Sequence, residues 1–315
     1  MTGARAILAG LLAGLALAGC GAVSAAHGRR SVSSQTSTTG TVSRVELVRR
    51  PAPPAYPLVR PVAGGTQNTG FVPAVLWRGK TAVWVARRSG IALLSFDQRL
   101  VGLHLHSGTV DAGVGGWRWG AAIAGQERRR LVGAFNSGFK LDTGSGGFML
   151  GGRTAVALTP GLGSIVTYAN GRTDIGAWHA GVPAPGQPVV SVRQNLHLLV
   201  SGGRPAGDLG CFSCWGATLG GTPSPARSAL GITGDGHLIW AGGETLTPAA
   251  LAAVLIAARV QRAVELDINP EWVAAYLYRH GRRSLRAVPI VPGQPGVPGQ
   301  FMSPYSRDFF TVVSR

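Results

Sequence analysis

Two segments decide the fold: Arg227-Ser-Ala-Leu-Gly-Ile-Thr-Gly-Asp-Gly236 and Ala263-Val-Glu-Leu-Asp-Ile-Asn-Pro-Glu-Trp272. In the first segment, a strand pattern at 228–233 meets Gly-Asp-Gly, a tight-turn signal, and a second apolar run at 237–241 returns antiparallel. Between the two segments, Thr247 suits an N-cap and Pro248 suits the first helical position, so we predict a helix over 248–260.

The second segment predicts a strand that carries acidic residues. Apolar residues at 264, 266 and 268 alternate with Glu265 and Asp267, so a period of two places both carboxylates on one strand face. Same-face neighbours lie roughly 6.5–7 Å apart, near the separation that glycosidases use. Asn269 and the following proline end the strand and present Glu271 and Trp272 at its rim. The alternative is a carboxylate that simply faces solvent.

The remaining composition favours one β-rich domain. The chain contains 48 glycines and 20 prolines among many short Val, Ile and Trp runs, which indicates numerous strands and turns. Residues 62–315 show no second linker, and the chain has no solenoid-length repeat. We therefore predict an α+β fold, a single β-rich domain in which a hairpin-helix-strand module carries the site.

An upstream polar turn adds a family resemblance. Asn136-Ser137-Gly138-Phe139, the segment from Arg227 to Ile232, and Leu266-Asp267 occur in the order of motifs in the phosphodiester glycosidase family. The chain resembles this family, the N-acetylglucosamine-1-phosphodiester alpha-N-acetylglucosaminidase type, over residues 71–315. The resemblance implies hydrolysis of a sugar-1-phosphodiester at the anomeric carbon. We predict no cofactor, and we assign no residue as a metal ligand.

The same resemblance suggests roles for charged residues. Asp267 would be the nucleophile or base, with Glu265 or Glu271 as its partner. Arg227 would bind phosphate oxygens in a fork, although an ion pair with one of these acids is an equal alternative. Lys140 would supply a second positive charge.

Polar turn residues and aromatic rings would complete a carbohydrate-phosphate site. Asn136, Ser137 and Gly138 form a turn suited to sugar hydroxyls or to backbone approach to a phosphate. Trp215 and Trp272 lie near the acidic segment and would stack on sugar rings, whereas Trp240 is expected in the core.

One departure from the family pattern keeps a second function open. Ile268 and Pro270 occupy positions where the family has a glycine run, and neither side chain allows the close amide approach that glycine permits. The alternative to a hydrolase is therefore a non-catalytic protein that binds a glycan or phosphate in the cell envelope. A structural envelope lipoprotein is a third possibility.

The first residues resemble a bacterial lipoprotein signal. Arg5 precedes an apolar run, and Leu-Ala-Gly-Cys20 follows, so we predict a signal peptide at 1–20 with Cys20 as the lipidation site. An ordinary secretory signal is the alternative. Residues 21–61 are rich in Ser, Thr and Pro and predict a tether. The protein is then expected outside the cytoplasm, anchored to the cell membrane, with a carbohydrate-phosphate substrate or cell-wall glycan as partner.

Charge, cysteines and histidines limit other functions. The net charge of +17 favours anionic partners, but basic residues are scattered and no nucleic-acid motif occurs, so we expect no nucleic-acid partner. In an oxidising compartment, Cys211 and Cys214 are expected to form a disulfide rather than a redox or zinc site. His104 and His106 would share a strand face, and a solvated face is favoured over metal binding.

Overall fold

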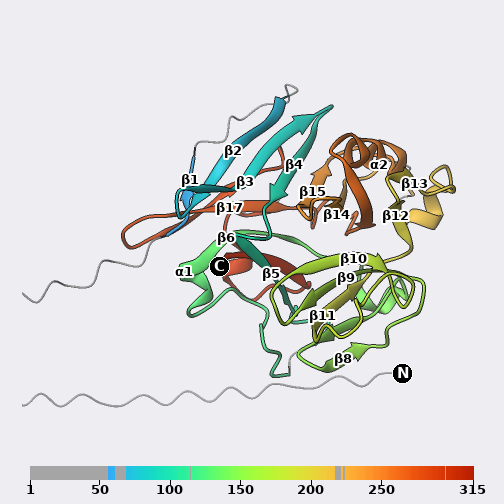
Figure 1. Cartoon of the computed structure of the whole chain (residues 1–315), viewed down its shortest axis with the longest axis horizontal. Helices are drawn as coiled ribbons and strands as arrows, with labels where there is room; N and C mark the ends of the chain where they lie inside the picture. The colour runs from blue at the N-terminus through green and yellow to red at the C-terminus, as the bar shows by residue number, and fades with distance from the viewer. Residues whose placement is uncertain (1–55, 61–68, 114, 217–220, 223, 295) are drawn as a thin grey trace, which may run out of the picture. The chain divides into compact units, whose positions relative to one another are not determined.

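Three antiparallel β-sheets make up the fold of the described residues (Figure 1). The structure is a computed structural model that describes residues 56–60, 69–113, 115–216, 221–222, 224–294 and 296–315. The predicted signal peptide at 1–20, the lipidation site Cys20 and the tether up to residue 55 lie outside the described residues.

The strands fall into sheets as follows. The first sheet has the order β1-β2-β3-β4-β15-β14-β16-β12-β13, with β1 Leu58–Val59, β2 Thr69–Trp77, β3 Lys80–Arg88, β4 Ile91–Phe96, β15 Leu238–Gly243, β14 Arg227–Thr233, β16 Val260–Glu265, β12 Leu198–Ser201 and β13 Arg204–Pro205. The second has the order β18-β17-β6-β19-β5, with β18 Leu285–Pro289, β17 Ala275–His280, β6 Leu131–Asn136, β19 Phe309–Ser314 and β5 Val101–His106. The third has the order β10-β9-β11-β7-β8, with β10 Thr173–Ala177, β9 Gly163–Tyr168, β11 Val189–Gln194, β7 Phe148–Leu150 and β8 Arg153–Val156.

Helices are few among the described residues. The α-helices are α1 Glu127–Arg130 and α2 Pro248–Ala257, and the 3₁₀ turns are η1 Leu141–Thr143, η2 Phe212–Trp215 and η3 Gln300–Met302. The fold is thus strand-rich, as the sequence predicts. No helix in the described part of the chain is long and apolar enough to cross a membrane.

The hairpin and helix between the two deciding segments form where their local signals place them. β14 pairs with β15 from Arg227 opposite Gly243 to Ile232 opposite Leu238. The connecting turn needs glycine at Gly236, where φ is +86°. Helix α2 lies beside this hairpin in Figure 1. Its N-terminus is capped by Thr247, whose hydroxyl accepts a 3.1 Å hydrogen bond from the amide of Ala250.

The core joins the first and second sheets through stacked and tilted aromatic rings. Phe135 on β6 lies between Phe96, Trp240 and Phe310, with ring centroids 6.0, 6.2 and 5.6 Å away. Trp240 is fully buried, which confirms its predicted place in the core. This contact fixes β6, and hence the turn that follows it, against the hairpin strand β15.

The compact unit that holds all three sheets spans Pro53–Arg315. Its first strand, Leu58–Val59, pairs antiparallel with β2. This strand lies within the range 21–61 that was predicted to be a tether. Two strand residues carry little sequence signal on their own, because their pairing partner at 75–76 supplies the hydrogen bonds.

The predicted strand through Ile268 is wrong in its extent, because β16 ends at Glu265. The amide of Leu266 still donates to the carbonyl of Ser228 on β14, at 2.8 Å. The next amide, of Asp267, donates instead to the carbonyl of Ser137, which follows β6 in the second sheet, at 2.9 Å. The chain therefore passes from one sheet to the next between these two residues, and Asp267 is not on a strand face with Glu265.

Candidate active site

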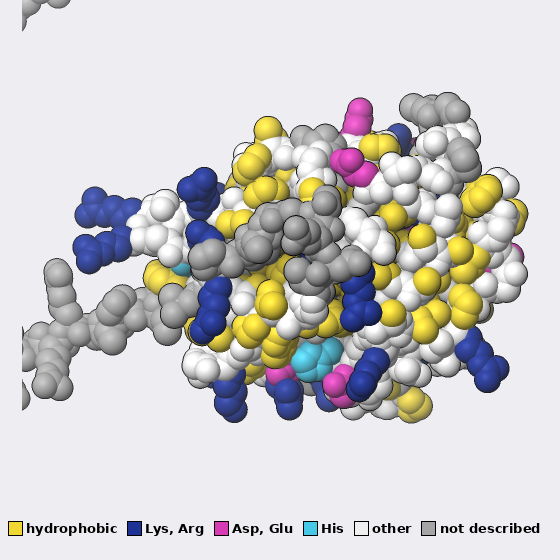
Figure 2. Space-filling model, turned by 90° about the horizontal axis from the view of Figure 1, so that it is seen from above, with side chains coloured by type: hydrophobic (Ala, Val, Ile, Leu, Met, Phe, Trp, Pro, Cys, Tyr) yellow, Lys and Arg dark blue, Asp and Glu magenta, His cyan; other side chains and the backbone are white. Residues whose placement is uncertain are grey.

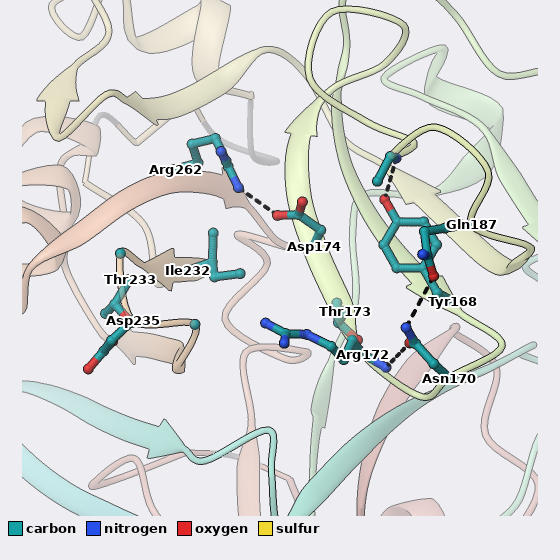
Figure 3. A pocket seen from close by; sticks show the side chains of 13 residues that line it. Tyr168, Asn170, Arg172, Thr173, Asp174, Gln187, Ile232, Thr233, Asp235 and Arg262 are labelled. Atoms are coloured by element: carbon teal, nitrogen blue, oxygen red, sulfur yellow. Dashed lines mark hydrogen bonds and ion pairs between the residues drawn. The ribbon is translucent and has the colours of Figure 1, made fainter.

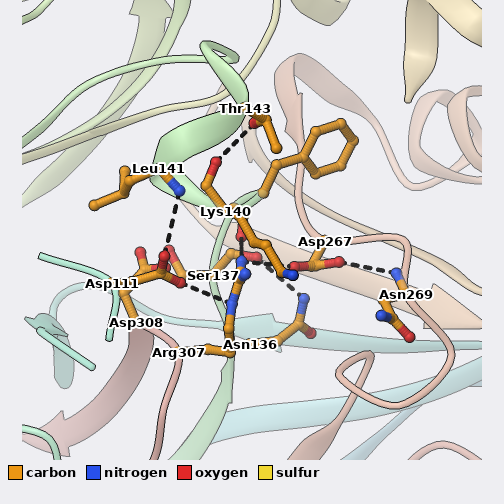
Figure 4. A network of polar contacts seen from close by, with 12 residues as sticks. Asp111, Asn136, Ser137, Lys140, Leu141, Thr143, Asp267, Asn269, Arg307 and Asp308 are labelled. Carbon is orange, nitrogen blue, oxygen red and sulfur yellow. Dashed lines mark hydrogen bonds and ion pairs between the residues drawn. The ribbon is translucent and has the colours of Figure 1, made fainter. Parts of the chain in front are cut away.

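The topology brings three loop segments together where strands β6 and β19 of the second sheet end and begin. Strands β6 and β19 are antiparallel neighbours, with Asn136 opposite Phe309, so the end of β6 meets the start of β19. The chain leaving β16 joins them, because Asp267 bonds to Ser137 after β6. Polar residues at 136–140, 267–272 and 307–308 therefore meet here (Figure 4).

Asp267 is the buried acid of this site. The residue is 5% exposed, and its Oδ2 lies 2.9 Å from Nη2 of Arg307. Its Oδ1 accepts a 2.8 Å hydrogen bond from the amide of Asn269. Burial raises the pKa of Asp267 to about 6, although the Arg307 charge and the amide bond oppose that rise. Such a carboxyl changes its protonation state close to neutral pH.

Arg307 holds two acids together at the site. Besides Asp267, its Nε lies 2.7 Å from Oδ2 of Asp111, and its Nη2 donates to the carbonyl of Gly138 at 3.0 Å. Burial, followed by the charge of Asp308, raises the pKa of Asp111. Figure 4 shows the guanidinium between the two carboxylates. A single buried cation thus fixes the position of both acids.

An aromatic ring and an exposed cation lie next to the buried Arg307. The ring of Trp272 lies 4.3 Å from the guanidinium carbon of Arg307 and 5.1 Å from Nζ of Lys140. Trp272 is half-buried and Lys140 is exposed. The cations are attracted to the face of the indole ring, which places the lysine at the outer rim of the site.

The polar turn after β6 holds the loops together. Nδ2 of Asn136 donates to Oγ of Ser228 at 2.9 Å, and its Oδ1 accepts from the amide of Ala274 at 3.3 Å. Asn136 is 2% exposed, so it fixes the backbone rather than presenting an amide to solvent. The hydroxyl of Ser137, in contrast, is buried with no hydrogen-bond partner among the described residues. Gly138 packs against Arg193, so closely that an added Cβ would lie 2.8 Å from the guanidinium carbon.

Arg227 and Glu265 form a separate buried pair. Nη1 of Arg227 lies 2.7 Å from Oε1 of Glu265, and the two residues are 1% and 0% exposed. The guanidinium also donates to the carbonyls of Leu246 and Trp215, at 3.0 and 2.7 Å. Of the two roles predicted for Arg227, the structure therefore has the ion pair with an acid, and Nε and Nη1 of the guanidinium are both occupied by protein acceptors. Burial raises the pKa of Glu265, and the charge of Arg227 opposes that rise.

The other predicted site residues lie apart from the buried acid. Glu271 is exposed, and its amide donates to Oδ1 of Asn269 at 3.0 Å. Trp215 is 2% exposed, and its indole nitrogen donates to Asp208 at 3.2 Å, so its ring does not face solvent as a sugar platform would. The structure thus joins Asn136, Ser137, Gly138, Lys140, Asp267, Asn269 and Trp272 around one carboxyl. Arg227, Glu265, Trp215 and the carboxylate of Glu271 make no hydrogen bond or ion pair with that carboxyl, although the charge of Asp267 helps to raise the pKa of Glu265.

Sequence reasoning missed Arg307 and Asp111. Neither belongs to a local motif, and each takes its role from partners far along the chain. The one available signal was the Arg307-Asp308 pair directly before the last apolar run, since charged residues at strand ends tend to be exposed or functional. Asp308 is itself buried and pairs with Arg193 at 2.6 Å.

The cysteine and histidine predictions have separate outcomes. Cys211 and Cys214 form a disulfide, as predicted. His104 and His106 both hydrogen-bond to the carboxylate of Glu127, at 2.8 and 3.1 Å. The predicted solvated face is wrong for His106, which is buried, whereas His104 is partly exposed. Within the described ranges, no three His, Cys, Asp or Glu residues are arranged to hold a metal ion.

Comparisons with known proteins place the chain only distantly. No protein-family model matches it, and no curated protein matches it. Among solved structures, it is similar to the catalytic domain of zebrafish N-acetylglucosamine-1-phosphodiester alpha-N-acetylglucosaminidase auto-inhibited by its pro-peptide, at 15% identity and a TM-score of 0.46, over 82% of this chain and 86% of that one. A hypothetical protein from Synechocystis is similar at 11% identity and a TM-score of 0.39, over 76% of this chain and 63% of that one. A putative exported protein from Burkholderia pseudomallei is similar at 13% identity and a TM-score of 0.36, over 74% of each chain. These similarities are too distant to assign a function.

Proposed function

We propose that the chain is a hydrolase that cleaves a sugar-1-phosphodiester at the anomeric carbon, with Asp267 as its base or nucleophile. The supporting observation is a buried carboxyl, with its pKa raised to about 6, held by Arg307 beneath Trp272 and Lys140. A carboxyl that titrates near neutral pH is suited to accept a proton or to attack carbon.

The chemistry assigns each neighbour a role. Asp267 accepts a proton from water as the water oxygen bonds to the anomeric carbon, or its own oxygen forms that bond first and water then displaces the carboxylate from the carbon in a second step. In either case the bond from carbon to the phosphate oxygen breaks, and the phosphate monoester leaves with the electron pair. That leaving group is weakly basic, so it needs charge stabilisation more than a proton. Lys140, exposed at the rim, supplies the positive charge, and Trp272 contacts the sugar ring.

Replacement of Asp267 tests this assignment. Asp267→Asn keeps the shape of the side chain, and we expect turnover of a panel of sugar-1-phosphate diesters to fall about 10²–10⁴-fold. Asp142→Asn makes the same chemical change on an exposed residue of η1 and serves as the matched control. Thermal unfolding of both variants checks that the fold is retained. Undiminished turnover by folded Asp267→Asn would disprove the assignment.

The pH dependence gives a second test of the same residue. A base or nucleophile acts in its ionised form, so kcat/KM should rise with pH and level off above about 6. The configuration of the released sugar then separates the two roles, because retention requires a covalent intermediate and inversion requires direct attack by water. A rate that falls as pH rises through about 6 would mean that Asp267 acts protonated, contrary to the proposal.

A non-catalytic binding protein is the alternative, and one feature favours it. Ile268 is 4% exposed and Pro270 lacks an amide hydrogen, so the loop after Asp267 offers few amides to stabilise the negative charge that develops on the leaving phosphate during hydrolysis. If no diester is turned over but Lys140→Ala weakens glycan-phosphate binding, the protein is a binding protein. If turnover depends on Asp267, the protein is a hydrolase.

We also propose that the protein is anchored outside the cytoplasm by lipid on Cys20. The proposal rests on the sequence Leu-Ala-Gly-Cys after an apolar run. Cys20→Ala should move the processed chain from the membrane fraction to the soluble fraction, because no other anchor is expected. Membrane retention of the correctly processed variant would contradict the anchor.

A further inference from the structure

A cavity of about 300 Å³ next to β5 and β19 is lined by three arginines and no carboxylate among the described residues. Arg118 comes from the loop after β5, Arg130 from the end of α1, and Arg315 follows β19. His104 and Trp119 also line it. None of these residues belongs to the site around Asp267.

Two of the arginines are held by neutral main-chain oxygens. Nε of Arg130 donates to the carbonyl of Ser314 at 2.7 Å. Each nitrogen of the Arg315 guanidinium donates one hydrogen bond to a carbonyl: Nε to Val101 at 3.0 Å, Nη1 to Asn170 at 3.3 Å, and Nη2 to Gly171. Carbonyl oxygens fix the orientation of a guanidinium but leave its charge uncompensated. Two positive charges are therefore positioned at the cavity without an acid.

The third arginine lies over an aromatic ring. The guanidinium carbon of Arg118 is 4.5 Å from the ring centroid of Trp119, whose other contact is the stacked ring of His104, with centroids 4.0 Å apart. Arg118 is exposed and makes no hydrogen bond from its guanidinium to any described residue. Its donors are thus free to meet a ligand.

Like charges crowd around Arg315. Burial lowers the pKa of Arg315, and the positive charges of Arg172 and Arg130 lower it further. A bound anion would relieve this repulsion and gain charge-assisted hydrogen bonds, because guanidinium groups present paired donors that match oxyanions.

The neighbouring cavity shows that this charge imbalance is local. That cavity, about 500 Å³ in volume, shares Tyr168 and Asn170 with the first and is also polar (Figure 3). There, however, Arg262 is paired with Asp174 at 2.6 Å, and Asp235 lies in the wall as well. On the face shown in Figure 2, Lys and Arg side chains are also scattered rather than gathered. The larger cavity therefore pairs an arginine with an acid, whereas none of the three arginines that line the smaller cavity forms an ion pair with a described residue.

We propose that the cavity between Arg118, Arg130 and Arg315 binds a phosphate group, either as free phosphate or as the phosphodiester of a glycan. The arginines bind the phosphate oxygens, and the ring of Trp119 contacts the group attached to the phosphate. The site goes beyond the proposed hydrolysis, since it shares no residue with the network of Asp267 and Arg307.

Nuclear magnetic resonance of the full-length chain tests the site through one ring. The chain has 8 Trp residues, and the indole N–H resonance of Trp119 is assigned by its loss in Trp119→Phe. Inorganic phosphate and a methyl diester of a sugar-1-phosphate are titrated separately, and we expect a saturable shift of this resonance. Tighter binding of the diester identifies a glycan phosphodiester as the ligand, and tighter binding of inorganic phosphate identifies free phosphate.

Charge-reversal variants distinguish a specific phosphate site from non-specific electrostatic attraction of anions to the basic protein. Arg118→Glu should weaken binding about tenfold or more, because it removes charge-assisted hydrogen bonds. Arg128→Glu makes the same change on an exposed residue of α1 that does not line the cavity, and screening should limit its effect to about twofold. Asp267→Asn should leave binding unchanged, so the result is independent of hydrolysis. The proposal fails if neither probe gives a saturable shift, if the two reversals weaken binding equally, or if glucuronate binds as tightly as the phosphates.

Discussion

Glu127 should make the stability of the fold depend on acid pH in a predictable direction. Its carboxylate lies 2.8 Å from His104, 3.1 Å from His106 and 2.6 Å from the hydroxyl of Thr311. Nδ1 of His106 lies 2.8 Å from the carbonyl of Gly120, a contact that orients the ring with Nε2 toward the carboxylate. An anion surrounded by donors is stabilised in its charged form.

The magnitude follows from the pKa. Burial alone would raise the pKa of Glu127, but the hydrogen bonds from His104, His106 and Thr311 lower it from 4.5 to about 2. At about 1.4 kcal/mol per pKa unit, this corresponds to about 3 kcal/mol of stability. Because the folded pKa is depressed, that stability is fully present above 4.5 and is lost as pH falls through about 2.

Urea unfolding of wild type and Glu127→Gln at several pH values measures the effect. The wild type should be more stable by about 3 kcal/mol near pH 6, and the gap should narrow by about half near pH 3, since the unfolded chain then takes up the proton. Glu271→Gln, at an exposed carboxylate, should show little change at any pH. A gap between wild type and Glu127→Gln that stays constant from neutral pH to about pH 3 would refute the reasoning.

Two further substitutions test buried contacts. Arg227→Met leaves Glu265 buried without its cation and should reduce the free energy of unfolding, measured by urea denaturation, by about 3–5 kcal/mol. Adding Glu265→Gln should restore part of this loss. If the double variant instead loses the sum of the two single losses, Arg227 and Glu265 do not stabilise the fold as a pair. Gly138→Ala brings a methyl group to 2.8 Å from the guanidinium carbon of the buried Arg193 and should cost about 1–3 kcal/mol in the same assay, whereas Gly207→Ala has open space and should be nearly neutral. Equal stability of the two alanine variants would show that the turn accommodates a side chain.

Local chemistry predicted the hairpin and α2, because their signals lie within a few residues of each other. Thr247 and Gly236 act through neighbours in the chain, so no tertiary knowledge was needed. The end of β16 was missed for the opposite reason. Whether the chain continues as a strand after Glu265 depends on the carbonyl of Ser137, which the periodicity of the segment does not contain.

The sequence allowed the acid of the candidate site to be predicted, but not the arginine that pairs with it. Asp267 stands out in a chain with 13 acidic residues, three of which lie between 265 and 271. Arg227 and Arg307 are two among many arginines, and only the fold decides which acid each one meets. An alternating pattern predicts toward which face of a strand a side chain points, but it does not predict which residues contact that side chain.

The position of β19 in the second sheet has a consequence for the order of folding. The strand lies between β5 and β6, so until Phe309–Ser314 pairs, β5 has no partner in this sheet and β6 is paired only with β17. Arg307 reaches the carbonyl of Gly138 across 169 residues of chain. Pairings of such high contact order are slow to form, on the millisecond-to-second rather than the microsecond scale. Until then, the edges of β5 and β6 remain open to other chains, so refolding yield should fall as protein concentration rises.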